Sequence, residues 1–401
     1  MDSITHIVVG ATAGYMVAGR TYGKRAMIWG ALGGSMPDID VISNLWTDPV
    51  DSLMAHRGIT HSLLFLAFGS VLLTWLNGLF YKNDLQNGRN MRFFVASFLL
   101  VLAAVTALVM NVLLLSFDGL WLLLSIPFCI WGGVKLIKIF RHYVLQPNIF
   151  VKPDFRIVWL VFFVSMSTHL FLDTCTVYGT GLLEPFSNHR FALSNISVVD
   201  IFFTIPAVVI ILLACVTHRG IYYTKINIAW MILYFALTFF NYQYMLDVFG
   251  RALDKKDIPV KKMLISPAIM NNFLWYSVAE TDTAFVTCSH SLFGQASVPD
   301  PINILPKSYQ LLPEAASSSQ LNTLKAFSRG YYNLVIDKQG DVQWNDLKFG
   351  MFSDAPKDAN DYLFKFKLRH DNGVWTAQKA SEMNKSLAEF WPEYWKRVWG
   401  Q

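Results

Sequence analysis

Histidine and aspartate residues gather in four short clusters in the first half of the chain. The clusters are Thr5-His6, Pro37-Asp38-Ile39-Asp40, His56-Arg57-Gly58-Ile59-Thr60-His61-Ser62 and His169-Leu170-Phe171-Leu172-Asp173. Residues four apart share one face of a helix, so His169 and Asp173 can reach a common point. Asp38 and Asp40 point the same way in an extended segment, or converge through the turn that Pro37 begins.

These clusters predict a shared divalent-metal site. Imidazole and carboxylate groups without thiolates suit Zn²⁺, Mn²⁺ or Fe²⁺, and Zn²⁺ is the expected ion. The number of ligands exceeds what one tetrahedral ion takes, so the prediction extends to two ions. The expected ligands are His6, Asp38, Asp40, His61, His169 and Asp173.

Other residues in and near the clusters are expected to support catalysis. Asp40 would bridge or orient the ligands, and His56 would be a further ligand or a proton shuttle. Arg57 would stabilise developing negative charge. The catalytic set is therefore His56, Arg57 and Asp40.

The loop at 178–190 follows the last cluster, and loops on a rigid scaffold often carry substrate contacts. Arg57 and Arg190 could clamp an anionic group, or pair with nearby acidic side chains. Glu184 could act as a general base or be an ordinary loop acid. The residues expected to bind substrate are Arg57, Glu184, Ser187 and Arg190.

The elements that position these residues are predicted to be transmembrane helices. Of 401 residues, 54% are hydrophobic and 15% are charged, which excludes a wholly soluble or disordered chain. A span needs about 20 apolar residues. Six segments qualify, at 59–80, 93–116, 119–139, 156–175, 198–217 and 225–246, and two shorter glycine-rich segments lie at 4–20 and 25–37. We therefore expect a mainly α, polytopic helical bundle of about eight segments.

Loop charges predict the orientation of this bundle. Short cytoplasmic loops carry an excess of Lys and Arg, and alternate loops here hold thirteen of them, against only Arg57 and Arg190 on the other side. Both termini and all four clusters then lie at the outer face. Each cluster alone has an ordinary explanation, such as a core histidine or an Asx-capped turn, but their gathering at one face favours a common site.

The charge pattern changes near residue 250, where the chain becomes more polar. We expect a transmembrane domain over 1–249 and a small soluble α+β domain over 250–401. Alternating apolar stretches separated by turn residues predict antiparallel hairpins, for example at 273–279 with 283–288, and at 331–336 with 342–349. A C-terminal helix is expected at 381–399; its aromatic residues would pack on the sheet or anchor at the membrane interface.

The four clusters, together with Pro185-Phe186-Ser187, resemble the YdjM-type, LexA-associated inner-membrane metal-dependent hydrolases of bacteria. The resemblance covers roughly residues 1 to 200, and its most specific element is His56-Arg57-Gly58-Ile59-Thr60-His61-Ser62. It implies hydrolase activity and a place in the bacterial inner membrane, with the C-terminal domain on the periplasmic side. The extra spans and the C-terminal extension depart from short members of the family.

The predicted function is a membrane-bound, divalent-metal-dependent hydrolase acting at the outer face. Its substrate would be an ester or phosphoester of a lipid or an envelope-linked molecule, and its partner is the lipid bilayer. The alternatives are a cation-binding transporter or channel, and a non-catalytic scaffold that metal stabilises. The net charge of +5 is not concentrated in a basic block, so no nucleic-acid partner is expected. The sequence does not indicate an oligomeric state.

Overall fold

The computed structural model describes residues 1–82, 152–294 and most of 299–401, with scattered positions between 93 and 141. Within the last range, the description omits 300, 314–317, 354–355, 357, 372–373 and 381–386. The spans predicted at 93–116 and 119–139 lie almost entirely outside the described residues.

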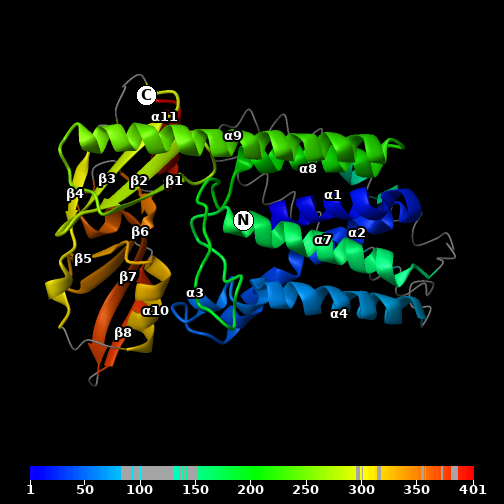
Figure 1. Ribbon diagram of the computed structural model, residues 1–401, viewed down its shortest axis with the longest axis horizontal. Coiled ribbons are helices and arrows are strands. Elements are labelled where there is room, and N and C mark those ends of the chain that lie inside the picture. The colour runs from blue at the N-terminus through cyan, green and yellow to red at the C-terminus, as the bar shows by residue number, and fades with distance from the viewer. Residues whose placement is uncertain are drawn as a thin grey trace.

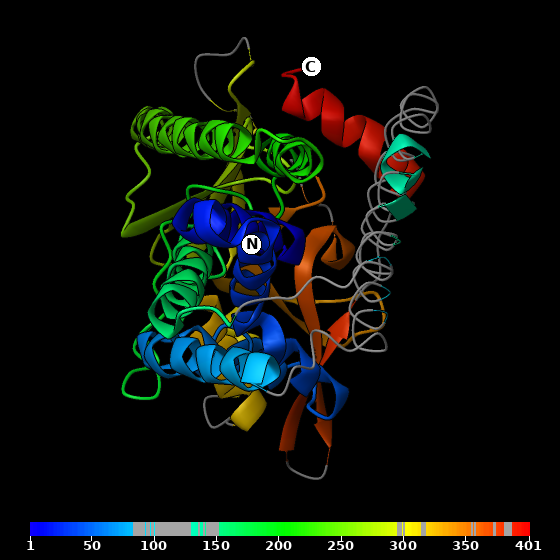
Figure 2. The ribbon, with the colours of Figure 1, turned by 90° about the vertical axis from the view of Figure 1, so that its right-hand side faces the viewer.

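Two glycine-rich helices form the centre of the bundle. Helix α1 (Ser3–Tyr22) is followed at once by α2 (Lys24–Ser35), and the two pack backbone against backbone. A Cβ placed on Gly10 would lie 2.4 Å from the carbonyl oxygen of Gly30, so no larger side chain fits there. Small residues permit this approach, and α1 also contacts α7, α8 and α9, which surround it (Figure 2).

The remaining described helices of the bundle are α4 (Leu63–Lys82), α7 (Phe155–Thr174), α8 (Ile201–Val216) and α9 (Gly220–Asp254). Among the described residues, α4, α7 and α9 are long and apolar enough to cross a membrane, whereas α8 is apolar but shorter. These four correspond to four of the predicted spans.

The prediction of about eight segments was wrong for the part of the chain that the structure describes. The segments at 4–20 and 25–37 do form helices, but α2 has only 12 residues and α1 does not qualify as a span. The physical reason is their glycine content, which lowers the apolarity of both helices and lets their backbones pack against each other. The boundary predicted at 249 falls inside α9, which continues to Asp254.

Two antiparallel sheets form the C-terminal domain, as the hairpin patterns predicted. The first contains β1 (Lys262–Pro267), β2 (Leu274–Glu280), β3 (Ala284–Ser291) and β4 (Asn303–Pro306), in that order. The second contains β5 (Tyr332–Ile336), β6 (Val342–Met351), β7 (Tyr362–Asp371) and β8 (Val374–Ala380). Tyr276, Val278 and Phe285 of the first sheet pack with Leu347 of the second. Helix α11 (Leu387–Val398) packs Phe390 and Tyr394 against Leu274.

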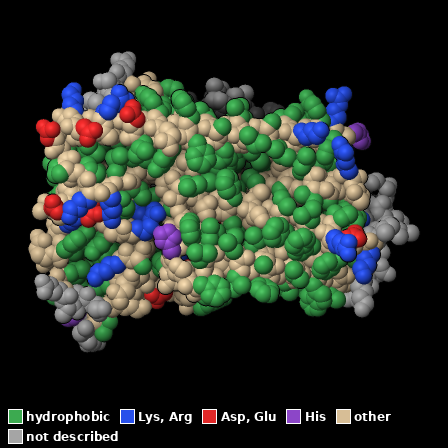
Figure 3. Space-filling model, in the orientation of Figure 1, with side chains coloured by type: hydrophobic (Ala, Val, Ile, Leu, Met, Phe, Trp, Pro, Cys, Tyr) green, Lys and Arg blue, Asp and Glu red, His purple; other side chains and the backbone are tan. Residues whose placement is uncertain are grey.

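The domain lies against one end of the bundle, and α9 runs along both parts (Figure 1). On one side, Phe249 of α9 packs against Trp275 of β2. On the other, Leu53 of the short helix α3 (Ser52–Ala55) packs against Leu324 and Phe327 of α10 (Ser319–Ser328). Figure 3 shows hydrophobic side chains spread over the helical part, with charged side chains at its two ends. This distribution suits a bundle embedded in a bilayer.

Candidate metal centre

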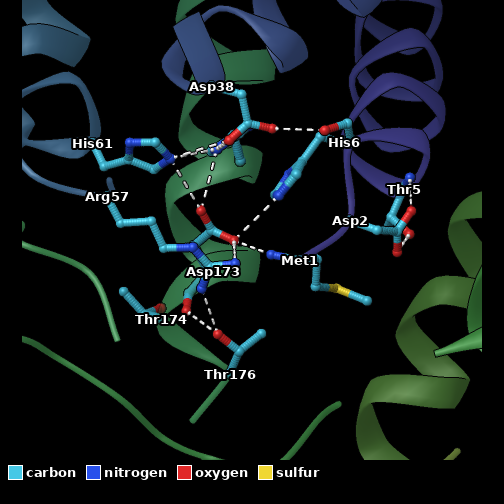
Figure 4. A network of polar contacts seen from close by, with 12 residues as sticks. Met1, Asp2, Thr5, His6, Asp38, Arg57, His61, Asp173, Thr174 and Thr176 are labelled. Atoms are coloured by element: carbon cyan, nitrogen blue, oxygen red, sulfur yellow. Dashed lines mark hydrogen bonds and ion pairs between the residues drawn. The ribbon is translucent and has the colours of Figure 1, made fainter. Parts of the chain in front are cut away.

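Four side chains from three elements meet at the end of the bundle that faces the C-terminal domain. Asp38 lies on the 3₁₀ helix η1 (Pro37–Leu45), His61 on the 3₁₀ turn η2 (Ile59–His61), and His169 and Asp173 on the last turns of α7. One nitrogen or oxygen atom of each lies within 4.8 Å of those of the others, an arrangement that could hold a metal ion. Figure 4 shows how Asp38 and His61 converge on Asp173.

The separations between these four atoms fit one small cation. The Nε2 atoms of His61 and His169 are 3.0 Å apart, and each lies 3.2 Å from Asp173 Oδ2. Asp38 Oδ1 is 3.5 Å from His61 Nε2 and 3.6 Å from His169 Nε2. Ligands bound about 2.0 to 2.1 Å from a tetrahedral ion stand about 3.3 Å from one another. The four atoms are therefore already spaced as ligands.

Hydrogen bonds to the other ring nitrogens fix the direction of both imidazoles. His169 Nδ1 lies 2.6 Å from the carbonyl oxygen of Gly34, which can only accept, so Nδ1 carries the proton. His61 Nδ1 lies 3.0 Å from Thr60 Oγ1, whose own hydrogen goes to Asp40 Oδ2. Nε2 of His169 is therefore unprotonated, and Nε2 of His61 faces it at 3.0 Å. A positive charge must lie between these two nitrogens, either the second proton of His61 or a bound metal ion.

The charge around this point also favours a cation. Burial alone would lower the pKa of His61, but the carboxylates of Asp173, Asp38 and Asp40 raise it to about 10. Burial alone would raise the pKa of Asp38, but its contact with His61 holds it below the ordinary value. Asp173 Oδ2 is buried and has no hydrogen-bond partner among the described residues. The residues present thus fit a divalent ion, which would satisfy this oxygen and replace the proton on His61.

Arg57 and His6 hold the other oxygen of Asp173. Arg57 is 2% exposed, and its guanidinium contacts Asp173 Oδ1 at 3.1 Å and Thr176 Oγ1 at 2.6 Å. His6 Nε2 lies 3.2 Å from the same Oδ1, and the amino group of Met1 also contacts it. Oδ1 therefore anchors the carboxylate while Oδ2 faces the imidazoles. A direct contact between Arg57 and substrate, as the sequence predicted, would require this pairing to break.

His6 lies behind the four-residue group and is not part of it. Its ring stacks on that of His169, with centroids 3.5 Å apart, and its Nδ1 is buried without a partner among the described residues. The structure thus places this predicted ligand where it supports Asp173 and His169.

Asp40 and His56 form a second group with Asp38 that could also hold a metal ion. However, Asp40 Oδ1 lies 3.1 Å from His56 Nδ1, and Asp40 Oδ2 accepts hydrogen bonds from Arg57 N at 2.9 Å and Thr60 Oγ1 at 3.0 Å. Both of its oxygens are engaged, so Asp40 is better placed to orient His61 than to bind an ion. The side chain of His56 is 27% exposed, the most of the residues around the centre.

The residues predicted to bind substrate in the 178–190 loop occupy different places. The Glu184 carboxylate lies over Gly58, where an added Cβ would come within 2.7 Å of Oε2, and burial raises the pKa of Glu184. Arg190 is buried and donates to the carbonyl oxygens of Met54 and His56. The Ser187 hydroxyl accepts from His189 N within its own turn. The structure brings Glu184 to the edge of the centre but does not bring Ser187 there.

Sequence reasoning missed three groups that orient the centre. They are the hydroxyls of Thr60 and Thr176 and the carbonyl oxygen of Gly34. Thr60 lies inside the His-Arg-Gly-x-Thr-His-Ser element, so its position between two predicted functional residues was an available signal. A backbone carbonyl carries no signal in the sequence.

The fold and this centre define a helical membrane protein with a His/Asp group at one end of its bundle that could hold a metal ion. The model of the YdjM inner membrane protein family matches residues 1–245, and the chain belongs to that family. The match includes all four clusters and ends within α9, before the sheet domain. No curated protein and no solved structure matched the chain.

Proposed function

We propose that this protein is a membrane-bound, divalent-metal-dependent hydrolase that cleaves an ester or phosphoester of a lipid or envelope-linked substrate. The observation that supports the proposal most directly is the pair of Nε2 atoms of His61 and His169, which face each other 3.0 Å apart; an ion that displaced the proton of His61 would bind both. With the carboxylate oxygens of Asp38 and Asp173 beside them, they form a ligand set that would suit one ion. Zn²⁺ suits two imidazoles and two carboxylates best, with Mn²⁺ or Fe²⁺ as alternatives.

We expect the centre to bind one ion, held by Asp38, His61, His169 and Asp173. A second would have to share Asp38 and displace the hydrogen bonds that Asp40 makes with Thr60 and the backbone of Arg57. A divalent ion in the first group supplies Lewis acidity, which activates water and polarises the scissile bond.

Other residues around the centre would orient the ligands and transfer protons. Arg57 fixes the angle of Asp173, and Asp40 fixes the tautomer of His61 through Thr60. His56 is partly exposed and hydrogen-bonded to Asp40, so it can pass a proton between the centre and solvent. Glu184 is a second candidate to accept a proton, because its carboxylate lies over Gly58 at the edge of the centre.

The orientation of the bundle supports an outer, periplasmic position for the centre. Basic residues lie near the ends of the helices that point away from the C-terminal domain: Arg20, Lys24, Arg25, Arg156, Arg219 and Lys225. By the positive-inside rule, that end faces the cytoplasm of a bacterial inner membrane. The centre and the sheet domain then lie on the opposite side.

The test is the metal content and hydrolytic activity of purified full-length protein in detergent. We expect about one equivalent of metal and release from phosphoester or lipid-ester substrates. His169→Ala should lose both, whereas His189→Ala, an exposed histidine in the adjacent loop, should lose neither. Bound metal without turnover over a broad substrate panel would favour the scaffold. Metal flux into proteoliposomes would favour the transporter.

A further inference from the structure

Helix η1 carries ligands on one side and an uncovered apolar row on another. In a 3₁₀ helix, residues three apart eclipse one another, so Ile39, Ile42 and Leu45 form one row. All three are exposed, Leu45 at 82%, and the neighbouring Trp46 is also exposed. Asp38 and Asp40 lie on the same element but turn to the metal centre. Exposed apolar patches commonly mark surfaces that bind another molecule or a membrane. We therefore expect such a partner to cover the row on η1.

The C-terminal domain does not cover this row; it covers a different side of the centre. Leu53 of α3 is buried against α10, and the rings of Tyr178 and Phe327 make an edge-to-face contact with centroids 5.0 Å apart. Arg329 adds a hydrogen bond to the carbonyl oxygen of Val177. The described part of the domain thus covers the centre over α3 and the start of the 178–190 loop, while Ile39, Ile42 and Leu45 of η1 stay exposed.

The side left free is also the side from which the centre can be reached. The side chains of His61, His169 and Asp173 have no exposed surface, whereas that of Asp38 is 15% exposed. Among the four grouped residues, only Asp38 therefore offers a path from outside. Asp38 belongs to η1, so that path runs beside the apolar row.

The row lies on an element that is linked through η2 to the start of α4. Asp40 ties η1 to the segment before α4, because it accepts a hydrogen bond from Thr60 at 3.0 Å. The first residues of α4, Leu63 and Leu64, are exposed, as is Phe68 further along this candidate span. Exposed apolar residues therefore run from the span to η1, and what covers α4 in the membrane is lipid.

We propose that the substrate of this centre is a membrane lipid that enters sideways from the bilayer along η1. Its polar head would meet the centre beside Asp38, while its apolar chain would stay against Ile42, Leu45 and the first turn of α4. This inference rests on the proposed hydrolase function and narrows its substrate to an amphiphile resident in the bilayer. A soluble ester would lack the contact with the row.

A photo-crosslinking experiment tests the contact with lipid without relying on activity. A benzophenone amino acid would replace Leu45 in the full-length protein, in native membranes. Phe68, on the lipid-facing side of α4, is the positive control, and Asp282, exposed on the sheet domain, is the negative control. We expect lipid adducts at positions 45 and 68 and none at 282. Adducts at 68 without any at 45, or adducts of position 45 with a second copy of the chain, would overturn the proposal.

Kinetics then separate this inference from the proposed function. The double variant Ile42→Ser, Leu45→Ser should hydrolyse a vesicle-embedded phospholipid about tenfold more slowly, with bis-p-nitrophenyl phosphate turnover and metal content unchanged. Asn44→Ser, an exposed change on the same helix, should alter neither rate. Equal effects on both substrates, or no effect, would contradict lateral entry. If the wild-type protein cleaves neither substrate, the hydrolase proposal fails, and the cross-linking result still decides whether lipid contacts η1.

Discussion

Arg57 binds Asp173 through Oδ1, the carboxylate oxygen that faces away from the two imidazoles. The contact is 3.1 Å long and buried, and it leaves Oδ2 directed at His61 and His169. Removing a partner that orients a ligand without binding the ion typically lowers metal affinity or activity about 10-fold to 100-fold. Arg57 is thus expected to act on metal binding first.

Replacing Arg57 should therefore weaken metal binding about 10-fold to 100-fold. Arg57→Gln removes the charge beside Asp173, and Arg57→Lys keeps the charge but loses the fork that also holds Thr176. Competition with a fluorescent chelator measures the affinity. Arg251→Gln, an exposed arginine paired with Asp247, is the control and should leave it unchanged. Wild-type affinity in both Arg57 variants would show that Asp173 is oriented without this contact.

Removing the metal should destabilise the protein. An ion that binds only the folded state adds about 2.7 kcal/mol when its free concentration is 100 times its Kd. Addition of EDTA should lower the Tm in detergent, and added Zn²⁺ should restore it. His169→Ala should make the Tm insensitive to both. An equal response to EDTA in the wild-type protein and in that variant would place the bound ion elsewhere.

The close approach of α1 and α2 should tolerate no side chain at Gly10. A methyl group there would lie 2.4 Å from the Gly30 carbonyl oxygen, and neither backbone can move without separating the helices. Gly10→Ala should cost about 1 to 3 kcal/mol of stability, visible as a lower Tm. Gly250→Ala, in α9, has no atom within 4 Å of the new Cβ and is the matched control. A Tm unchanged by Gly10→Ala would refute the backbone contact.

Stability should fall with rising pH through Asp200. This residue caps α8, and burial raises its pKa from 3.8 to about 7 although it accepts hydrogen bonds from Tyr234. The folded state therefore keeps a proton that the unfolded state releases near pH 4, so this contribution is full below that pH and is lost up to about pH 7. The Tm of Asp200→Asn should lack this decline, because asparagine caps as well without a charge.

The control for Asp200 is Asp154→Asn at the exposed N-cap of α7, which accepts the same kind of backbone hydrogen bonds. Its Tm should follow the wild-type dependence on pH between 4 and 7. If Asp200→Asn shows the wild-type decline as well, another group is responsible for it.

The grouping of Asp38, His61, His169 and Asp173 was largely predictable because its signals are local. His169 and Asp173 are four apart on a helix, and the Pro37-Asp38-Ile39-Asp40 turn ends an apolar segment. What could not be predicted is which of these groups would face the ion and which would orient the others. The sequence does not show that Arg57 would be buried behind Asp173, or that the two oxygens of Asp40 would be taken by hydrogen bonds, because both depend on contacts between distant segments.

In the fold as well, features with local sequence signals were predictable, and features set by contacts between distant segments were not. The β2–β3 and β5–β6 hairpins follow from alternating apolar residues with turn residues between them. The eight strands that the structure describes form two separate sheets, which meet where Tyr276 packs near Leu347, and no local pattern encodes this division. In the bundle, apolarity identified α4, α7 and α9, but the glycines of α1 and α2 marked an interior position rather than two further spans.

Helix α9 passes unbroken from the far end of the bundle into the sheet domain (Figure 1). Its 35 residues extend about 52 Å at 1.5 Å per residue. A continuous rod of this kind provides no hinge along its length, so a tilt of the sheet domain would be transmitted as a lever movement to the wall of the bundle. A force applied to the sheet domain would then displace the helices of the bundle.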